Sequence, residues 1–214
     1  NVSWKYRQPI NISSQYDLTD YVIKIELNSS NVGTNFDWNR DREAIRFVYY
    51  NSTSGEFFKS NYWIAQWDSA NQKAVIYIKV PSLEKNKNTT IDMYYGNVSV
   101  VSNESNATKT FALYDDFESY SIGDDAKPPW EWYSTDGGSV SFSVQSVSGN
   151  KAYESAASAT GYPAEAVRST SYSLGKNYTV EGLVRDTGAA DNDPHPGLVF
   201  TWQDSGNYDG IYLR

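Results

Sequence analysis

Cysteine is absent from this 214-residue chain, and methionine and histidine each occur once. Without cysteine the chain can form no disulfide scaffold, thiolate metal site or cysteine nucleophile. A protein without disulfides must be held together by the burial of apolar surface. The length is sufficient for one large domain or two small ones, each with its own core.

Long apolar runs are also missing. No stretch approaches the roughly 18 consecutive apolar residues of a membrane-spanning helix, so we expect no membrane span in this chain. The chain begins with Asn1 rather than Met, and its start lacks a charged segment followed by an apolar one. Such a start is typical of a processed mature chain or of a shortened one.

Basic residues are comparatively few. The chain has 18 lysines and arginines against 26 aspartates and glutamates, which gives a net charge of −8. A protein that binds a phosphate backbone needs a cluster of basic residues, and no such cluster is present. The composition therefore argues against a nucleic-acid partner.

Asn-x-Ser/Thr triplets, the acceptor motif for N-linked glycans, are abundant instead. Chance would give about three of them in a chain of this composition. The nine acceptor positions, none followed by Pro, are Asn1, Asn11, Asn28, Asn51, Asn88, Asn97, Asn103, Asn106 and Asn177. A bulky glycan must lie on the surface, so the excess predicts an N-glycosylated extracellular or cell-surface protein, of the cysteine-free kind common among archaeal surface proteins. The structural alternative is a sequence that uses Asn and Ser as turn residues.

Apolar and polar residues alternate with a period of two over most of the chain, which also holds 18 Tyr and 7 Trp. Both features are typical of β-strands with one buried face. The clearest strands are residues 21–27, 45–50, 74–80 and 90–95. Because no apolar stripe of helical spacing exceeds two turns, we predict an all-β fold with strands spaced as in a sandwich.

A polar segment from Val98 to Thr110 separates two parts of the chain. It carries two of the triplets and no core-forming residue, so we expect an exposed connector. We place the boundary near residue 105 and predict two tandem β-sandwich domains of the jelly-roll type, residues 1–104 and 105–214. The strands expected in the second domain are residues 111–117, 139–147, 152–157, 166–172, 178–185, 197–203 and 208–213.

Five short segments follow one another in the first domain with a distinctive spacing. They are Trp4-x-Tyr6-Arg7-x-Pro9-Ile10-x-Ile12, Ile45-Arg46-Phe47, Tyr62-Trp63-Ile64 before Trp67, Ile76-Tyr77-Ile78-Lys79-Val80-Pro81 and Tyr94-Tyr95-Gly96-Asn97. Together they resemble a widespread domain of unknown function found in large archaeal and bacterial exported or cell-surface proteins. The resemblance covers about residues 3–100 and departs at Ala65, where Glu is frequent, and at Ile76 and Tyr77, where Trp is frequent. It implies a surface location and no known chemistry.

Other segments carry a second resemblance. They are Tyr114–Tyr120, Ile122-Gly123, Pro129-Trp130, Gly197–Gln203 and Asn207–Tyr212. These are similar to the concanavalin-like jelly roll of lectins, glucanases and laminin-G domains, a fold that serves recognition, catalysis and adhesion and so does not choose among them. Such a sandwich usually needs more chain than remains here. We expect either continuation beyond Arg214 or a strand from another copy, with residues 2–12 as the donor.

No catalytic residue is predicted. Glycoside hydrolysis needs two carboxyl groups about 5–10 Å apart, for example in Glu-x-Asp-x-Glu on one strand, and the sequence has no such triplet. Glu181 and Asp186 flank one expected strand with the wrong spacing. The single histidine, His195, lies between two prolines, and no serine has the elbow motif of a nucleophile. We therefore expect that the chain is not an enzyme.

Three acidic residues at the start of the second domain form the candidate metal site. Asp115, Asp116 and Glu118 offer hard oxygen ligands of the kind that Ca²⁺ accepts. A structural calcium ion is the one cofactor we consider for this chain. The alternative is a solvated acidic turn.

Three aromatic residues, Trp130, Trp132 and Tyr133, form the candidate carbohydrate site. They follow Pro128-Pro129, so we expect them in a loop, where their rings can stack on a sugar. The alternative is that Trp130 is buried over the core.

Two function classes follow from these patterns. The first is a structural or adhesive module of a cell surface, such as a subunit of a filament or layer, whose partners are other copies of itself or other surface proteins. The second is a carbohydrate-binding module of a larger carbohydrate-active protein. The dense triplets and the missing carboxylate pair favour the first.

Overall fold

A computed structural model describes residues 4–51, 54–125, 130–134, 140–157, 165–169, 179–184, 197–204 and 207–212. The chain divides into two compact units, residues 1–114 and 115–214. Residues 105–114, which the sequence analysis placed in the second domain, therefore lie with the first unit. Among the described residues, the helices lack the length and hydrophobicity that a membrane-spanning helix needs.

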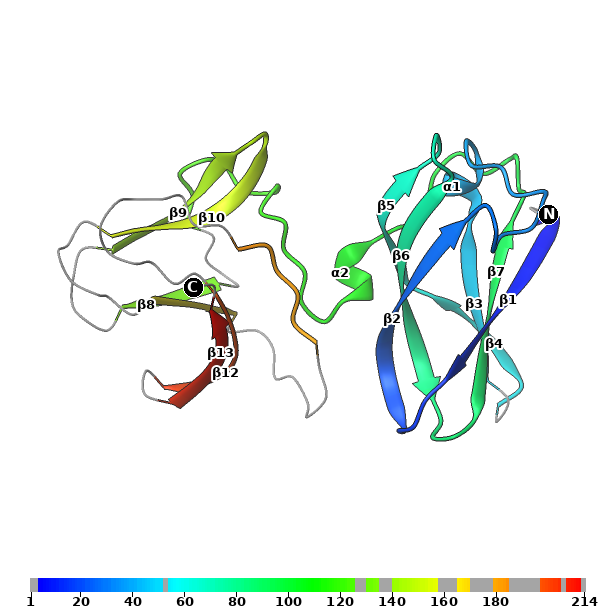
Figure 1. The fold of residues 1–214 in the computed structure, drawn as a ribbon, viewed down its shortest axis with the longest axis horizontal. Helices are drawn as coiled ribbons and strands as arrows, with labels where there is room; N and C mark the ends of the chain where they lie inside the picture. The colour runs from blue at the N-terminus through cyan, green and yellow to red at the C-terminus, as the bar shows by residue number, and fades with distance from the viewer. Residues whose placement is uncertain are drawn as a thin grey trace. The chain divides into compact units, whose positions relative to one another are not determined.

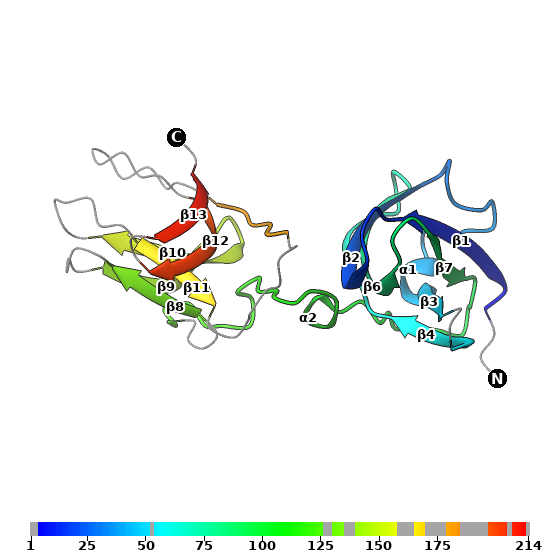
Figure 2. The same cartoon turned by 90° about the horizontal axis from the view of Figure 1, so that it is seen from below.

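The first unit is a β-sandwich of two antiparallel sheets. Its elements are β1 (Tyr6–Ser13), β2 (Leu18–Asn28), α1 (Asp41–Ala44), β3 (Arg46–Asn51), β4 (Glu56–Ser60), β5 (Tyr62–Asp68), β6 (Lys73–Leu83), β7 (Asn88–Tyr95) and α2 (Ala107–Thr110). One sheet has the strand order β1-β7-β3-β4 and the other β2-β6-β5. Figures 1 and 2 show the two sheets of this unit facing each other. The prediction of an all-β sandwich fold is confirmed.

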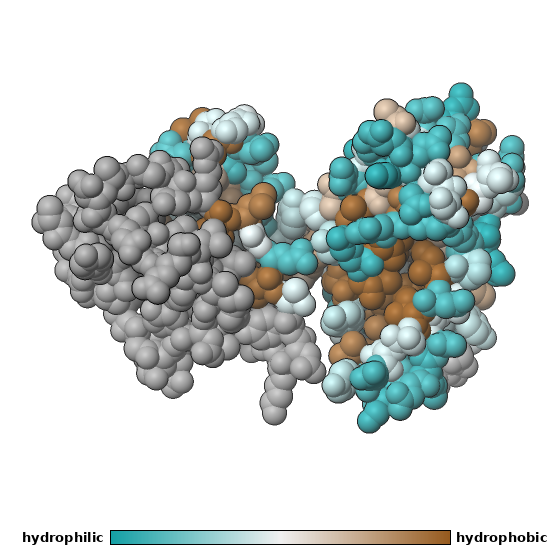
Figure 3. All heavy atoms as spheres, in the orientation of Figure 1, coloured by the Kyte–Doolittle hydropathy of each residue, from teal (hydrophilic) through white to brown (hydrophobic). Residues whose placement is uncertain are grey.

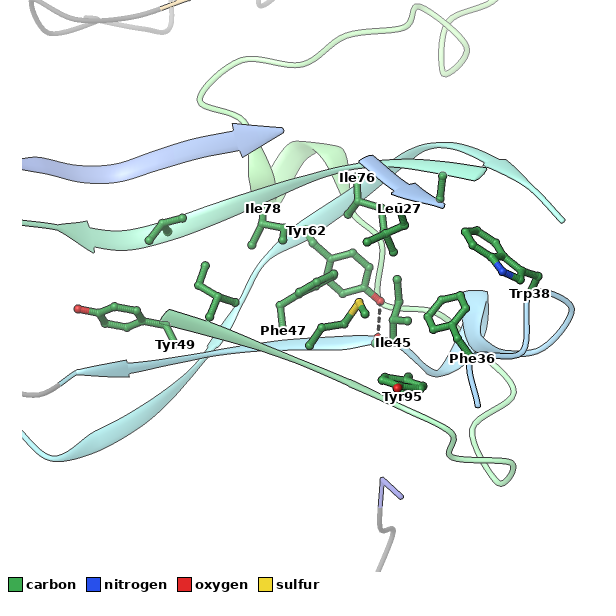
Figure 4. Close-up of a cluster of buried hydrophobic side chains, with 14 of the residues drawn as sticks. Leu27, Phe36, Trp38, Ile45, Phe47, Tyr49, Tyr62, Ile76, Ile78 and Tyr95 are labelled. Atoms are coloured by element: carbon green, nitrogen blue, oxygen red, sulfur yellow. Dashed lines mark hydrogen bonds between the residues drawn. The ribbon is translucent and has the colours of Figure 1, made fainter. Parts of the chain in front are cut away.

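Alternation along the central strands produces the core. In β6 every second residue from Ala74 to Val80 is buried, and in β7 Ile91, Met93 and Tyr95 are buried in the same way. Phe47 and Tyr62 meet these residues between the sheets, as Figure 4 shows. Each fully buried side chain of this size contributes about 1.5–3 kcal/mol relative to exposure. Burial of this core is the main stabilising contribution to a unit that has no disulfide.

Tyr62 also carries a polar group into the core. Its hydroxyl donates a hydrogen bond to the carbonyl oxygen of Ile45 (3.0 Å, dashed in Figure 4) and accepts one from the backbone N–H of Glu104 (3.1 Å). Burial raises the pKa of this phenol. A buried hydroxyl with both partners satisfied costs little and fixes the position of the ring.

The segment predicted as an exposed connector is tied to the edge of β5. The backbone N–H of Asn106 donates to the carbonyl oxygen of Tyr62 (2.8 Å), and that of Ile64 donates to Ser105 Oγ (2.8 Å). Ala107 and Thr110 in α2 are buried. The connector therefore occupies backbone groups that an open sheet edge would leave unpaired, which is one way natural sheets avoid further pairing.

An ion cluster holds the same segment against β3 and β4. The Glu104 carboxylate forms ion pairs with Nε of Arg46 (3.1 Å) and with Nζ of Lys59. Burial acts to raise the pKa of Glu104, but the hydrogen bonds and charges of Lys59 and Arg46 outweigh it and hold the pKa below its ordinary value. Arg46 is itself buried, and its guanidinium also donates to the carbonyl oxygen of Ser102 (3.2 Å).

Four aromatic rings lie on the outer face of the β2-β6-β5 sheet. Trp63 of β5 and Tyr77 of β6 contact each other at 5.7 Å between ring centroids, and Phe111 and Tyr114 pack on them at 5.1–5.6 Å. We call these four residues the outer aromatic cluster. The expectation of a strand at residues 111–117 is wrong, because this segment has no strand and uses its aromatic side chains as anchors instead.

The sandwich is open along one side. β1 and β2 are both edge strands, and their core-facing residues Ile10, Ile12, Ile23 and Ile25 are only partly buried. Figure 3 shows hydrophobic side chains gathered between β2 and β1, framed by hydrophilic ones. We call this the open side of the first unit.

The second unit contains three antiparallel strand pairs in its described part. Its strands are β8 (Trp130–Ser134), β9 (Val140–Val147), β10 (Asn150–Ala157), β11 (Glu165–Ser169), β12 (Gly197–Asp204) and β13 (Asn207–Tyr212). β8 pairs with β11, β9 with β10 and β12 with β13. Residues 179–184 form no strand, so the strand expected at 178–185 is wrong over those six positions.

Candidate functional site

The structure describes seven of the nine acceptor asparagines. Asn11 and Asn88 are exposed, and four others are partly exposed: Asn28, Asn51, Asn103 and Asn106. Asn1 and Asn177 lie outside the described residues. Most of the described acceptors thus lie at the surface, at strand ends or beside turns, where a glycan can leave the protein.

Asn97 does not meet the expectation of exposure. It is 5% exposed, and its Nδ2 is buried with no hydrogen-bond partner in the described part of the chain. The glycan bond forms at this nitrogen. Asn97 follows Gly96, whose φ of 77° lies in the left-handed region that favours glycine. The Asn97 triplet is therefore inaccessible in the folded first unit.

Three of the triplets form local turns. In each, the Asn Oδ1 accepts a hydrogen bond from the backbone N–H two residues later: Asn28 from Ser30 (2.9 Å), Asn97 from Ser99 (3.1 Å) and Asn103 from Ser105 (3.2 Å). This is the turn role that the structural alternative predicts for Asn. These three asparagines therefore have a reason to be present besides glycosylation.

Two triplets oppose each other across β1 and β7. Asn11 of β1 pairs with Thr90 of β7, and Ser13 pairs with Asn88. The acceptor of each triplet thus faces the hydroxyl residue of the other. Thr90 Oγ1 donates to Asn11 Oδ1 at 2.9 Å. All four residues are exposed on the outer face of the sheet.

The predicted calcium ligands do not converge. Within the described residues no three acidic or histidine side chains form a group that could hold a metal ion. Asp115 instead accepts hydrogen bonds from the Phe117 N–H (2.8 Å), the Tyr120 hydroxyl (3.1 Å) and Trp130 Nε1 (2.6 Å). Its carboxylate therefore fixes the positions of the Tyr120 and Trp130 side chains.

The other two acidic residues also have protein partners. Asp116 Oδ1 accepts from the backbone N–H of Glu118 (3.2 Å), and Glu118 Oε1 accepts from that of Lys151 (2.7 Å). Nζ of Lys151 donates back to the carbonyl oxygen of Glu118 (2.9 Å). Glu118 therefore attaches the start of the second unit to β10.

The predicted carbohydrate site is not a loop. Trp130, Trp132 and Tyr133 lie in β8, where they pair with Ser169, Val167 and Ala166 of β11. Pro128 and Pro129 precede the first residue of β8 in the sequence, so neither proline interrupts the ladder between β8 and β11. The Trp130 ring is partly buried and packs on Phe117 at 5.8 Å. The side chains of Trp132 and Tyr133, like His195, lie outside the described residues.

Sequence reasoning missed a buried carboxylate. Asp41, the first residue of α1, is 1% exposed, and its two oxygens accept hydrogen bonds from the N–H groups of Asp37 (2.7 Å) and Gly96 (2.8 Å). Burial raises the pKa of this carboxyl group. The side chain joins α1 to the turn after β7, a role that no period-two pattern can reveal.

A family model matches residues 41–135, and its description is domain of unknown function (DUF2341). The match begins at Asp41 and runs through the connector into β8. Neither a comparison with curated proteins nor one with solved structures gives a match. Residues 41–135 are therefore similar to a family whose function is undefined, and the similarity brings no assigned chemistry to this chain.

Proposed function

We propose that this chain is an N-glycosylated extracellular or cell-surface protein with a structural or adhesive role, such as a subunit of a surface filament or layer. The observation that carries the proposal is the placement of the acceptor asparagines. Six of the seven described ones reach the surface of the first unit, and two of these, Asn11 and Asn88, lie on one exposed face. The exported or surface setting of the resembling family supports the same location.

An exposed aromatic hairpin supports contact with another protein. Tyr50, Phe57 and Phe58 on β3 and β4 are 46%, 65% and 41% exposed, and the rings of Tyr50 and Phe57 lie 4.9 Å apart. Clustered exposed aromatic residues are typical of protein contact surfaces. Partners of the kind proposed are other copies of this chain or other surface proteins.

We propose that the N-terminal strand is not the donor for such an assembly. All eight residues of β1 pair with β7 in the same molecule, from Tyr6 opposite Tyr95 to Ser13 opposite Asn88. To donate residues 2–12 to a neighbour, the chain would have to break this ladder. Assembly through other surfaces, such as the β3-β4 hairpin, fits the structure better.

For the second unit we propose a concanavalin-like jelly roll, supported by its three antiparallel strand pairs. A carbohydrate-binding role has less support than the structural one. The indole nitrogen of Trp130 donates to Asp115, and its ring is partly buried against Phe117. A sugar platform requires an aromatic face that is open to solvent.

Surface labelling tests the location. Intact source cells would be treated with a membrane-impermeant amine reagent, and the tryptic peptides of this protein would be compared before and after cell lysis. We expect labelled lysines on intact cells, while a cytoplasmic protein in the same sample is labelled only after lysis. Labelling that appears only after lysis would refute a surface location.

A further inference from the structure

We propose that Asn11 and Asn88 form one paired glycan site, whose two glycans shield the edge strand β1 from pairing with strands of other molecules. The inference rests on the proposed glycosylation and names its main site. It starts from the reciprocal register, in which Asn11 lies opposite Thr90 and Ser13 opposite Asn88.

The register places both acceptors on one face. Residues of β1 alternate between partly buried and exposed, and Asn11 and Ser13 are at exposed positions, as are Asn88 and Thr90 in β7. Asn11 and Asn88 are diagonal neighbours across the ladder, a separation of about 7–8 Å in antiparallel pairs. Two glycans attached there leave the sheet side by side, beside its edge.

The chemistry of attachment suits both positions. The Nδ2–C1 bond to the sugar forms while the C1–O bond to the phosphate of an activated glycosyl donor breaks, and Nδ2 gives up one proton. The hydrogen bond from Thr90 engages Oδ1 of Asn11 and not the nitrogen that carries the sugar. Asn88 is the first residue of β7, at the exposed end of the strand.

β1 is the edge that needs protection. It borders the open side, where its apolar residues Ile10 and Ile12 are only partly covered. Its eight residues include one charged side chain, Arg7, whereas the facing edge β2 carries Asp20, Lys24 and Glu26. Natural sheets protect exposed edges with charge, proline or a covering group. β1 has Pro9, and the paired glycans supply the covering group.

A double variant tests the shield. Ser13→Ala removes the Asn11 triplet but keeps Asn11 and its bond from Thr90, and Asn88→Gln removes the second acceptor at an exposed position. Ser30→Ala, which removes the Asn28 triplet by changing an exposed serine, is the matched control. All would be produced in a glycosylating host and analysed by glycopeptide mass spectrometry and by size-exclusion chromatography with light scattering.

We expect glycans on both Asn11 and Asn88 in the unaltered protein. The double variant should lose both and associate with rising concentration, whereas the control should lose one glycan and keep the parent's association state. Bare Asn11 and Asn88 beside occupied acceptors elsewhere would overturn the paired site and leave the glycoprotein proposal standing. Occupied sites with a double variant that associates no more than the parent would overturn the shielding role. Absence of glycans at every acceptor would overturn the glycoprotein proposal itself.

Discussion

Gly96 shows at the scale of one residue why the Tyr-Tyr-Gly-Asn motif has its composition. Its φ is +77°, and a Cβ there would lie 2.5 Å from the Tyr6 ring. Gly55 has a similar φ of +73°, but a Cβ there would meet nothing within 4 Å. A side chain at Gly55 would therefore cost only the unfavourable backbone φ. A side chain at Gly96 would add a steric clash with Tyr6.

We predict that Gly96→Ala lowers the free energy of unfolding by about 2–4 kcal/mol, since it adds overpacking to an unfavourable φ. Gly55→Ala should cost only about 1 kcal/mol, the cost of the φ alone. Urea denaturation of both variants measures the difference. Equal losses would show that the contact with Tyr6 is not important.

Asp41 provides a prediction about pH. Because burial raises its pKa, the folded state binds the proton more tightly than the unfolded state does. The stability that this group contributes is therefore present below the unfolded pKa of about 3.9 and is lost as pH rises through the folded pKa. The loss of stability in Asp41→Asn should then be larger at pH 4 than at pH 7 in denaturation experiments. A loss that grows from pH 4 to pH 7 would contradict the direction of the shift.

Asn97 provides a prediction about modification. Its Nδ2 is buried, so attachment of a glycan would require the turn after Gly96 to open. Glycopeptide mass spectrometry should find Asn97 unmodified in protein that carries glycans at Asn11 and Asn88. High occupancy at Asn97 would contradict the burial of its Nδ2 in the folded first unit.

At the scale of elements, the outer aromatic cluster joins the connector to the β2-β6-β5 sheet. Phe111 contacts both Trp63 (5.6 Å) and Tyr77 (5.2 Å). We predict that Phe111→Ala costs about 2 kcal/mol of stability, from lost burial and lost aromatic contacts. Phe57→Ala on the exposed hairpin should cost less than about 1 kcal/mol. Thermal unfolding of the two variants compares them, and equal shifts in Tm would mean that Phe111 does not anchor the connector.

Strands with one buried face were predictable because their alternation repeats over many residues. The expected strands 21–27, 74–80 and 90–95 lie inside β2, β6 and β7. The connector was not predictable, because Ser105 and Asn106 bond to the β5 backbone through single polar contacts that leave no periodic trace. The same alternation wrongly predicted a strand at residues 111–117. This segment has no strand, and its residues Phe111 and Tyr114 pack on Trp63.

For the candidate sites, the sequence supplies residue types but not their neighbours. Acceptor triplets can be located directly in the sequence. The burial of Asn97 and the opposition of Asn11 and Asn88 depend on which strands pair and in which register. In the same way, Asp115 looks like a metal ligand until Trp130, fifteen positions later, is found donating to it.

For the whole molecule, we propose glycans on the exterior of a first unit that has a buried apolar core and an exposed aromatic hairpin. Each acceptor that is occupied adds mass to a polypeptide of 24.1 kDa. A protein that works outside the cell gains solubility from such glycans. The proposed function therefore depends most on N-glycosylation.

Intact mass spectrometry of the protein from its native source, before and after chemical removal of glycans, tests whether the acceptors carry glycans. We predict several discrete mass increments above the polypeptide mass, which disappear on deglycosylation, and glycopeptides that include Asn11 and Asn88. A single mass equal to that of the bare polypeptide would contradict the account and would leave the triplets explained by their role in turns.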